Sequence, residues 1–151
     1  MENIENFKII GIETKTTNED GKASDDLGKL WEQFFAKNVP NQIVNKKSDE
    51  IFAIYTDYES DYTGEYTCVI GMKVHSLDKI PDELIGREFE SGKYQKFIAK
   101  GEMPSAVVET WKDIWAKDKE LNRKYTADFE VYGGKSQNGE NSEVEIYIAK
   151  K

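Results

Sequence analysis

The sequence predicts an α+β fold: two βαββ units forming an antiparallel sheet, with both helices on one side and a ligand groove between the halves. The hydrophobic periodicity of the 151 residues gives the order strand, helix, strand, strand twice. In addition, the apolar residues of the two predicted helices align at a constant offset, as expected of a duplicated unit. Neither unit can bury its sheet alone, so the units should pack together, as one sheet or two abutting sheets. We expect a single domain over residues 1–151, with repeats at roughly 1–75 and 90–151.

The first half contains one predicted helix between strands. A strand is expected at about 4–13, where apolar residues occur among polar ones. A helix is expected at about 25–37, with Ser24 as its N-cap. Strands at about 50–58 and 64–74 follow. The apolar residues at helical spacing are Leu27, Leu30, Trp31, Phe34 and Phe35.

The second half repeats this order after a connection at about 75–92 that is rich in Pro, Asp and Gly. A strand runs through Tyr94, and Pro104 suits the first turn of the second helix. Strands at about 126–132 and 143–150 close the chain. The apolar residues of the second helix are Val107, Val108, Trp111, Ile114 and Trp115.

Aligning the halves shows that a shared fold requires neither of two glutamates in the second half. Trp111 lies 80 residues after Trp31, and the strands align at offsets of 77 and 76 residues. The counterpart of Glu130 is then Ala53, and Glu145 also falls on an apolar position of the first half. Both carboxylates are therefore additions to the second half.

Strand alternation assigns these glutamates to faces of the sheet. In the segment 128–132, Glu130 and Tyr132 point to one face of the sheet. Phe129 and Val131 point to the other face. In the last strand, Glu145 lies on the face opposite to the Val and Ile residues that should pack on the helices. We expect a groove on the sheet face away from the helices, containing both carboxylates. The alternative is ordinary decoration of a solvated strand face.

Composition excludes several functions. The formal net charge of −8 disfavours contact with nucleic acid and favours cationic ligands or basic partner surfaces. No apolar run approaches the roughly 20 residues that span a membrane, so a cytoplasmic location is expected. One histidine, one cysteine and scattered carboxylates form no metal site, and no cofactor motif is present. His75 is expected at the surface and Cys68 in the core.

The chain resembles the effector-binding domain of AraC-type and MerR-type multidrug regulators, the gyrase-inhibitor-like domain, and in particular its stand-alone members, such as integron-associated effector-binding proteins. The resemblance implies a duplicated βαββ fold that binds lipophilic cations among aromatic residues around a buried glutamate, which corresponds to Glu130. The segments that carry it are 54–62, 66–71, Gly92-Lys93-Tyr94, Asp128-Phe129-Glu130-Val131-Tyr132 and Val144-Glu145-Ile146-Tyr147-Ile148.

A buried carboxylate surrounded by aromatic faces is suited to a cation with an apolar body. For Trp111, the alternative to ligand contact is a core role, because Trp31 is its repeat equivalent on the first helix. Tyr55 and Tyr132 are also repeat equivalents, so a structural role is the alternative to ligand contact for both. The predicted ligand-binding residues are Glu130, Glu145, Tyr55, Tyr94, Trp111 and Tyr132.

Two other functions remain open from the sequence. A glutamate with a raised pKa could serve a hydrolase, as described for some relatives of this type. The acidic surface could instead bind a protein partner. No helix-turn-helix segment is found, so a regulatory role would require a separate DNA-binding protein.

Overall fold

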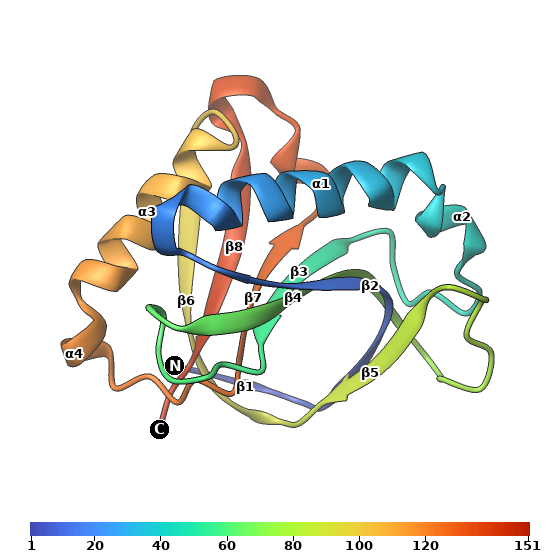
Figure 1. The fold of residues 1–151 in the computed structure, drawn as a ribbon, viewed down its shortest axis with the longest axis horizontal. Helices are drawn as coiled ribbons and strands as arrows, with labels where there is room; N and C mark the ends of the chain where they lie inside the picture. Colours follow the sequence, from blue (N-terminus) through green and yellow to red (C-terminus); the bar gives the residue numbers. More distant parts are fainter.

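An eight-stranded antiparallel sheet forms the frame of the protein, and both long helices lie on one of its faces (Figure 1). The computed structural model describes all residues, 1–151. The strands are β1 (Glu2–Ile4), β2 (Phe7–Thr17), β3 (Ile51–Thr56), β4 (Glu65–Val74), β5 (Ile85–Phe89), β6 (Gly92–Lys100), β7 (Ala127–Tyr132) and β8 (Glu143–Ala149). The helices are α1 (Lys22–Ala36), α2 (Val39–Gln42), α3 (Ser105–Ala116) and α4 (Asp118–Leu121), with 3₁₀ turns at Glu19–Gly21, Gly134–Ser136 and Gly139–Asn141.

The predicted α+β fold is confirmed. The chain runs β2-α1-β3-β4 and then β6-α3-β7-β8, and the strand order across the sheet is β1-β6-β8-β7-β3-β4-β2-β5. This order is symmetric about the β3–β7 contact, where the halves meet. The edge strands are exchanged: β1 precedes β2 in the chain but pairs with β6, and β5 precedes β6 but pairs with β2. The exchange ties the two halves together.

Several boundaries differ from the prediction. The first helix begins at Lys22, and Gly21 rather than Ser24 occupies the N-cap, with a left-handed φ of 70° that suits glycine. Pro104 immediately precedes the second helix instead of lying in its first turn. The strand Ile85–Phe89 was not predicted, because its short, partly polar sequence gives no clear period-two signal. In the structure, antiparallel pairing with β2 forms this strand.

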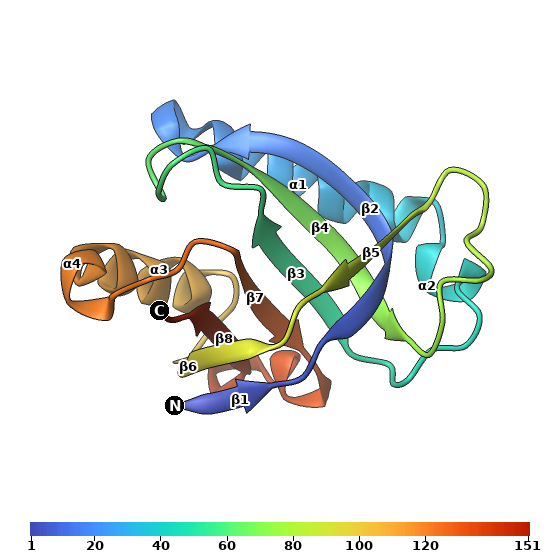
Figure 2. The same cartoon turned by 90° about the horizontal axis from the view of Figure 1, so that it is seen from below.

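The sheet face away from the helices is filled, so the groove expected there is absent. The sheet curls, and β1, β5 and β6 close over that face (Figure 2). An apolar cluster occupies the concave side, and its aromatic members are Phe7, Phe52, Phe89, Tyr94, Phe129 and Tyr147. The prediction placed the open groove on the wrong face, because alternation identifies residues that share a face but says nothing about how the sheet bends.

The helix-covered face contains the other two core clusters. Ala53, Cys68 and Ile70 pack beneath α1, and Val144, Ile146 and Ile148 pack beneath α3, as expected for the Val and Ile face of the last strand. Cys68 is fully buried and His75 is exposed, as predicted. No helix in the structure combines the length and the apolar character needed to cross a membrane.

Candidate functional site

Glu130 lies at the centre of the sheet, on the boundary between the two halves. It pairs in register with Ala53 on β3, which is also its counterpart in the repeat alignment. An antiparallel pair whose members are repeat equivalents must lie on the local two-fold axis. On its other side Glu130 pairs with Ile146, and directly opposed residues share a face of the sheet. Because Ile146 packs beneath α3, the Glu130 side chain points toward the space between the two helices.

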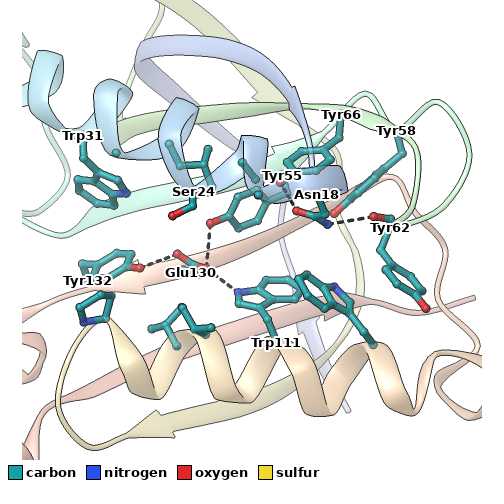
Figure 3. Close-up of a pocket in the computed structure, with 18 of the residues that line it drawn as sticks. Asn18, Ser24, Trp31, Tyr55, Tyr58, Tyr62, Tyr66, Trp111, Glu130 and Tyr132 are labelled. Atoms are coloured by element: carbon teal, nitrogen blue, oxygen red, sulfur yellow. Dashed lines mark hydrogen bonds between the residues drawn. The ribbon is translucent and has the colours of Figure 1, made fainter.

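Three neutral donors hold the Glu130 carboxylate (Figure 3). The Tyr55 hydroxyl and the Trp111 indole Nε1–H donate to Oε2, at 2.9 and 2.6 Å. The Tyr132 hydroxyl donates to Oε1 at 2.6 Å. The three donors come from β3, α3 and β7, so both halves of the chain build the site. Trp111 is therefore a member of the site rather than only a core residue.

Glu130 is 1% exposed, and none of the ion pairs in the structure includes it. Burial raises the pKa of this carboxyl above its ordinary value, and the hydrogen bonds from its three donors only partly oppose the rise. Burial and the nearby carboxylate also raise the pKa of the Tyr55 hydroxyl, so this donor keeps its proton at neutral pH. The three hydrogen bonds reduce the cost of a negative charge on Glu130, but no cation neutralises it.

A cavity of about 550 Å³ opens above Glu130, between α1 and α3 (Figure 3). Two edge-to-face pairs are part of its wall: Trp111 on Tyr55, with ring centroids 5.5 Å apart, and Trp31 on Tyr132, at 5.0 Å. Each pair joins one half of the chain to the other. The eight aromatic residues that line the cavity are Trp31, Tyr55, Tyr58, Tyr62, Tyr66, Trp111, Trp115 and Tyr132.

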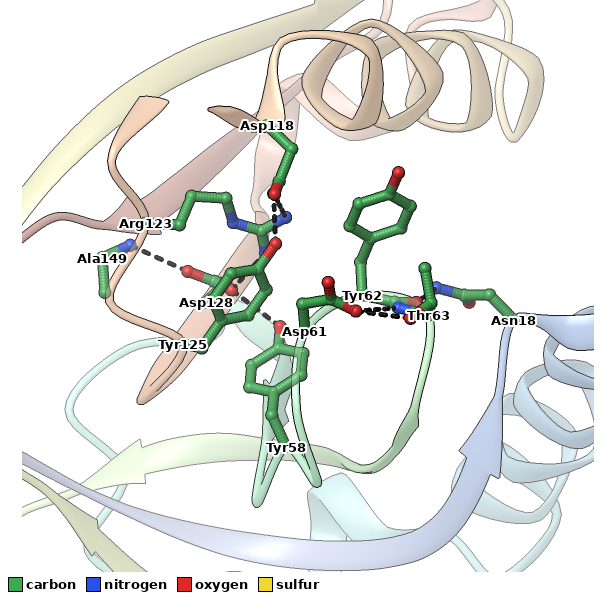
Figure 4. Close-up of polar contacts among 10 residues, drawn as sticks. All are labelled: Asn18, Tyr58, Asp61, Tyr62, Thr63, Asp118, Arg123, Tyr125, Asp128 and Ala149. Carbon is green, nitrogen blue, oxygen red and sulfur yellow. Dashed lines mark hydrogen bonds and ion pairs between the residues drawn. The ribbon is translucent and has the colours of Figure 1, made fainter. Parts of the chain in front are cut away.

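The only cationic side chain lining the cavity is already neutralised (Figure 4). Arg123 pairs with Asp128 at 2.7 Å and with Asp118 at 3.4 Å. Asp128 is fully buried and also accepts hydrogen bonds from the Tyr58 hydroxyl, at 2.7 Å, and the Ala149 N–H, at 2.8 Å. Two carboxylates thus surround Arg123, whereas Glu130 has no cation. Glu130 is therefore the one acidic residue lining the cavity, and it has no cationic partner.

The structure brings together four of the six predicted site residues, namely Glu130, Tyr55, Trp111 and Tyr132. The other two predicted residues do not line this cavity. Tyr94 is buried on the concave face, against Phe129. Glu145 lies on that same side of the sheet, with its side chain 41% exposed and paired with Lys96 at 3.0 Å. Glu145 is in register with Val131, the neighbour of Glu130 on β7, so the two glutamates point to opposite faces.

Sequence reasoning missed part of the aromatic wall. Trp31 was assigned only as a helix residue, although its repeat twin Trp111 was a candidate. Tyr58 and Tyr62 lie after β3, in a tyrosine-rich segment whose direction the strand pattern does not fix. Arg123 gave no signal, because it stands in the irregular segment before β7.

Comparison with known proteins identifies the family. The family model of integron-associated effector-binding proteins (Cass2) matches residues 1–149. The chain belongs to this family. The resemblance seen in the sequence is thereby confirmed.

Relatives of this integron-associated effector-binding protein include a candidate regulator and a cassette protein. The Bacillus subtilis (strain 168) protein YobU, named as a candidate transcriptional regulator, is 31% identical over 124 residues, 81% of this chain and 78% of YobU. The Vibrio cholerae integron cassette protein VCH_CASS2 is 30% identical, with a TM-score of 0.75, over 99% of this chain and 94% of that one. The protein SAV2435, solved with tetraphenylphosphonium bound, shares the fold at a TM-score of 0.82 and 20% identity, over 99% and 92% of the two chains.

Proposed function

We propose that this effector-binding protein binds a lipophilic small-molecule cation in the cavity between α1 and α3, with Glu130 as the counter-charge. The observation that carries the proposal is a carboxylate that is 1% exposed, contacted by neutral donors and free of any ion pair. A buried charge without a partner is costly, and a bound cation would remove that cost.

The aromatic wall supports a ligand that is apolar as well as charged. Trp and Tyr faces attract a cation by about 0.5–2 kcal/mol each when water is excluded. Their edges and faces also bury the apolar body of a ligand. The net charge of −8 attracts cations to the protein and opposes binding to nucleic acid. The tetraphenylphosphonium bound by SAV2435, which shares the fold, is a ligand of this chemical class.

Two ions of matched shape provide a direct test of the charge preference. Tetraphenylphosphonium and tetraphenylborate have nearly the same size and apolar surface but opposite charge. Isothermal titration calorimetry should detect binding of the phosphonium and little or no binding of the borate. Equal affinity for the two ions would show that the cavity recognises only apolar surface, and the role of Glu130 would be refuted.

Glu130→Gln tests the residue itself, because it removes the charge and preserves the size of the side chain. At a separation of about 5 Å and an effective dielectric constant of about 20, the lost attraction is about 3 kcal/mol. We therefore expect tetraphenylphosphonium to bind about 100-fold more weakly. The matched control is Glu145→Gln, which removes the same charge on the opposite face of the sheet and should change the affinity less than about twofold.

Hydrolysis by the same glutamate is a second candidate, favoured by the raised pKa of the buried Glu130 carboxyl. A general acid that works near neutral pH requires such a shift. Mass spectrometry of the ligand after prolonged incubation separates the two functions. Recovery of the unchanged ligand supports binding, and turnover that disappears in Glu130→Gln supports an enzyme.

A further inference from the structure

We propose that the cavity selects cations that also carry a neutral hydrogen-bond acceptor, such as a carbonyl oxygen, held by the Trp31 indole N–H and the Ser24 hydroxyl on α1. This inference rests on the proposed function, because Glu130 must bind the cationic part of the ligand. It defines the chemical class of the ligand more narrowly: an asymmetric molecule with a positive charge at one point and an acceptor at another.

The two-fold relation between the halves shows why Trp31 has a free donor. Trp31 and Trp111 are repeat equivalents, and each packs edge-to-face on a tyrosine of the other half. Trp111 uses its N–H on Glu130 at 2.6 Å. Glu130 lies on the axis but is a single side chain, and its two oxygens are occupied by Tyr55, Trp111 and Tyr132. The Trp31 N–H has no such acceptor and forms no hydrogen bond within the protein, although Trp31 lines the cavity.

A second polar group lies on the same wall of the cavity as Trp31. Ser24 lines the cavity from α1, two turns before Trp31, and its hydroxyl forms no hydrogen bond within the protein. Figure 3 shows the Ser24 hydroxyl and the indole nitrogen of Trp31 on the same side of the cavity, across from α3. At the offset of 80 residues that relates the helices, the counterpart of Ser24 is Pro104, which has no N–H or O–H group. The α1 wall therefore offers two unused polar groups, and the α3 wall offers none at these positions.

The chemistry of these groups specifies an acceptor. An indole N–H donates and cannot accept, and a serine hydroxyl can turn to donate as well. A negatively charged acceptor would be repelled by Glu130, so a neutral oxygen is favoured. A neutral hydrogen bond contributes about 0.5–1.5 kcal/mol net. One such bond in the upper half of this range, about 1–1.4 kcal/mol, corresponds to a preference of about 5- to 10-fold.

A pair of ligands that differ only in the acceptor measures this preference. The two probes are (4-acetylbenzyl)triphenylphosphonium and (4-isopropylbenzyl)triphenylphosphonium, in which a carbonyl oxygen replaces a methyl group of similar size. Wild-type protein should bind the acetyl compound about 5- to 10-fold more tightly by calorimetry. In ¹H–¹⁵N spectra, the Trp31 indole resonance should shift downfield with the acetyl compound and not with the isopropyl compound.

Two variants assign the preference to the named groups. In Ser24→Ala, and in Trp31→Phe, which keeps an aromatic face, the ratio of the acetyl to the isopropyl affinity should fall toward unity, whatever the change in the affinity that the two compounds share. If both compounds bind equally to wild type while Glu130→Gln weakens both, the acceptor site is refuted and the proposed function stands. If neither compound binds, or if Glu130→Gln leaves both affinities unchanged, the proposed function itself is refuted. A persistent preference in both variants, with no shift of the Trp31 indole resonance, would place the acceptor elsewhere and refute the assignment.

Discussion

The ligand-free protein should become more stable at neutral pH when Glu130 is replaced by Gln. An unpaired carboxylate that is 1% exposed has an effective burial cost of several kcal/mol. Its three hydrogen bonds return about 1.5–3 kcal/mol each, because the acceptor is charged. Gln keeps these contacts as neutral bonds of about 0.5–1.5 kcal/mol each: its oxygen accepts at the Oε2 position, and its amide donates to the Tyr132 hydroxyl. The replacement therefore weakens each of the three bonds by about 1 kcal/mol and removes a burial cost of several kcal/mol. Burial raises the pKa of Glu130 more than the hydrogen bonds lower it, so we expect burial to be the larger effect. The expected net gain is about 1–2 kcal/mol.

The gain should depend on pH with a defined sign. The pKa of Glu130 is higher in the folded protein than its ordinary value of 4.5, so the folded state binds this proton more tightly than the unfolded state. The wild type therefore has its full stability from this group below pH 4.5 and loses it as the pH rises through the folded pKa. The advantage of Glu130→Gln over the wild type should be smallest near pH 4 and largest at pH 7–8. Asp128 also has a raised pKa, but it is common to both proteins and cancels in the difference.

Thermal unfolding followed by circular dichroism between pH 4 and pH 8 measures this difference. For a protein of 151 residues, 1–2 kcal/mol corresponds to a rise in Tm of about 3–6 °C at pH 7.5. Glu145→Gln is the control, because this partly exposed side chain should change Tm by less than about 1 °C at any pH. A Tm of Glu130→Gln below that of the wild type across the whole pH range would refute the reasoning, because it would show that the charged hydrogen bonds outweigh the cost of burial.

Three further outcomes follow from other contacts. The affinity for tetraphenylphosphonium should rise with pH, because Glu130 loses its proton as the pH passes through its raised pKa. Calorimetry at pH 5 and pH 8 measures this change, and a pH-independent affinity would contradict it. Arg123→Met should destabilise the protein by about 3–5 kcal/mol in urea unfolding, because Asp128 is left buried without its cation. Adding Asp128→Asn should recover much of this loss, and a mild effect of the single variant would argue against a structural ion pair. Gly11→Ala should cost about 3 kcal/mol or more, because a Cβ there would overlap a carbonyl of β4. Gly28→Ala on α1, where an added Cβ meets no other atom, should stabilise by about 0.5–1 kcal/mol, and similar values for the two variants would refute the close approach of β2 and β4.

The sequence was informative wherever a regular period or the internal repeat constrained the answer. The helical spacing of apolar residues around Trp31 and around Trp111 predicted both long helices and their apolar faces. The offset of 80 residues between these two tryptophans related one helix to the other. The same alignment set Glu130 against Ala53, and this pair lies at the centre of the sheet. Boundaries were less certain, because the start of α1 depends on the backbone conformation of Gly21, which periodicity does not reveal.

The sequence by itself determined the order of the elements, the duplication and the position of Glu130 on a central strand. Only the tertiary structure decided which face of the sheet contains the cavity. Alternation along a strand fixes the residues that share a face, but the bend of the sheet comes from pairings distant in the chain, β1 with β6 and β5 with β2. Those pairings bury Tyr94 on the concave side, point Glu145 away from the cavity and leave Glu130 facing the two helices. The two-fold relation then gives Trp111 the carboxylate and leaves the N–H of Trp31 free, a difference that no local pattern contains.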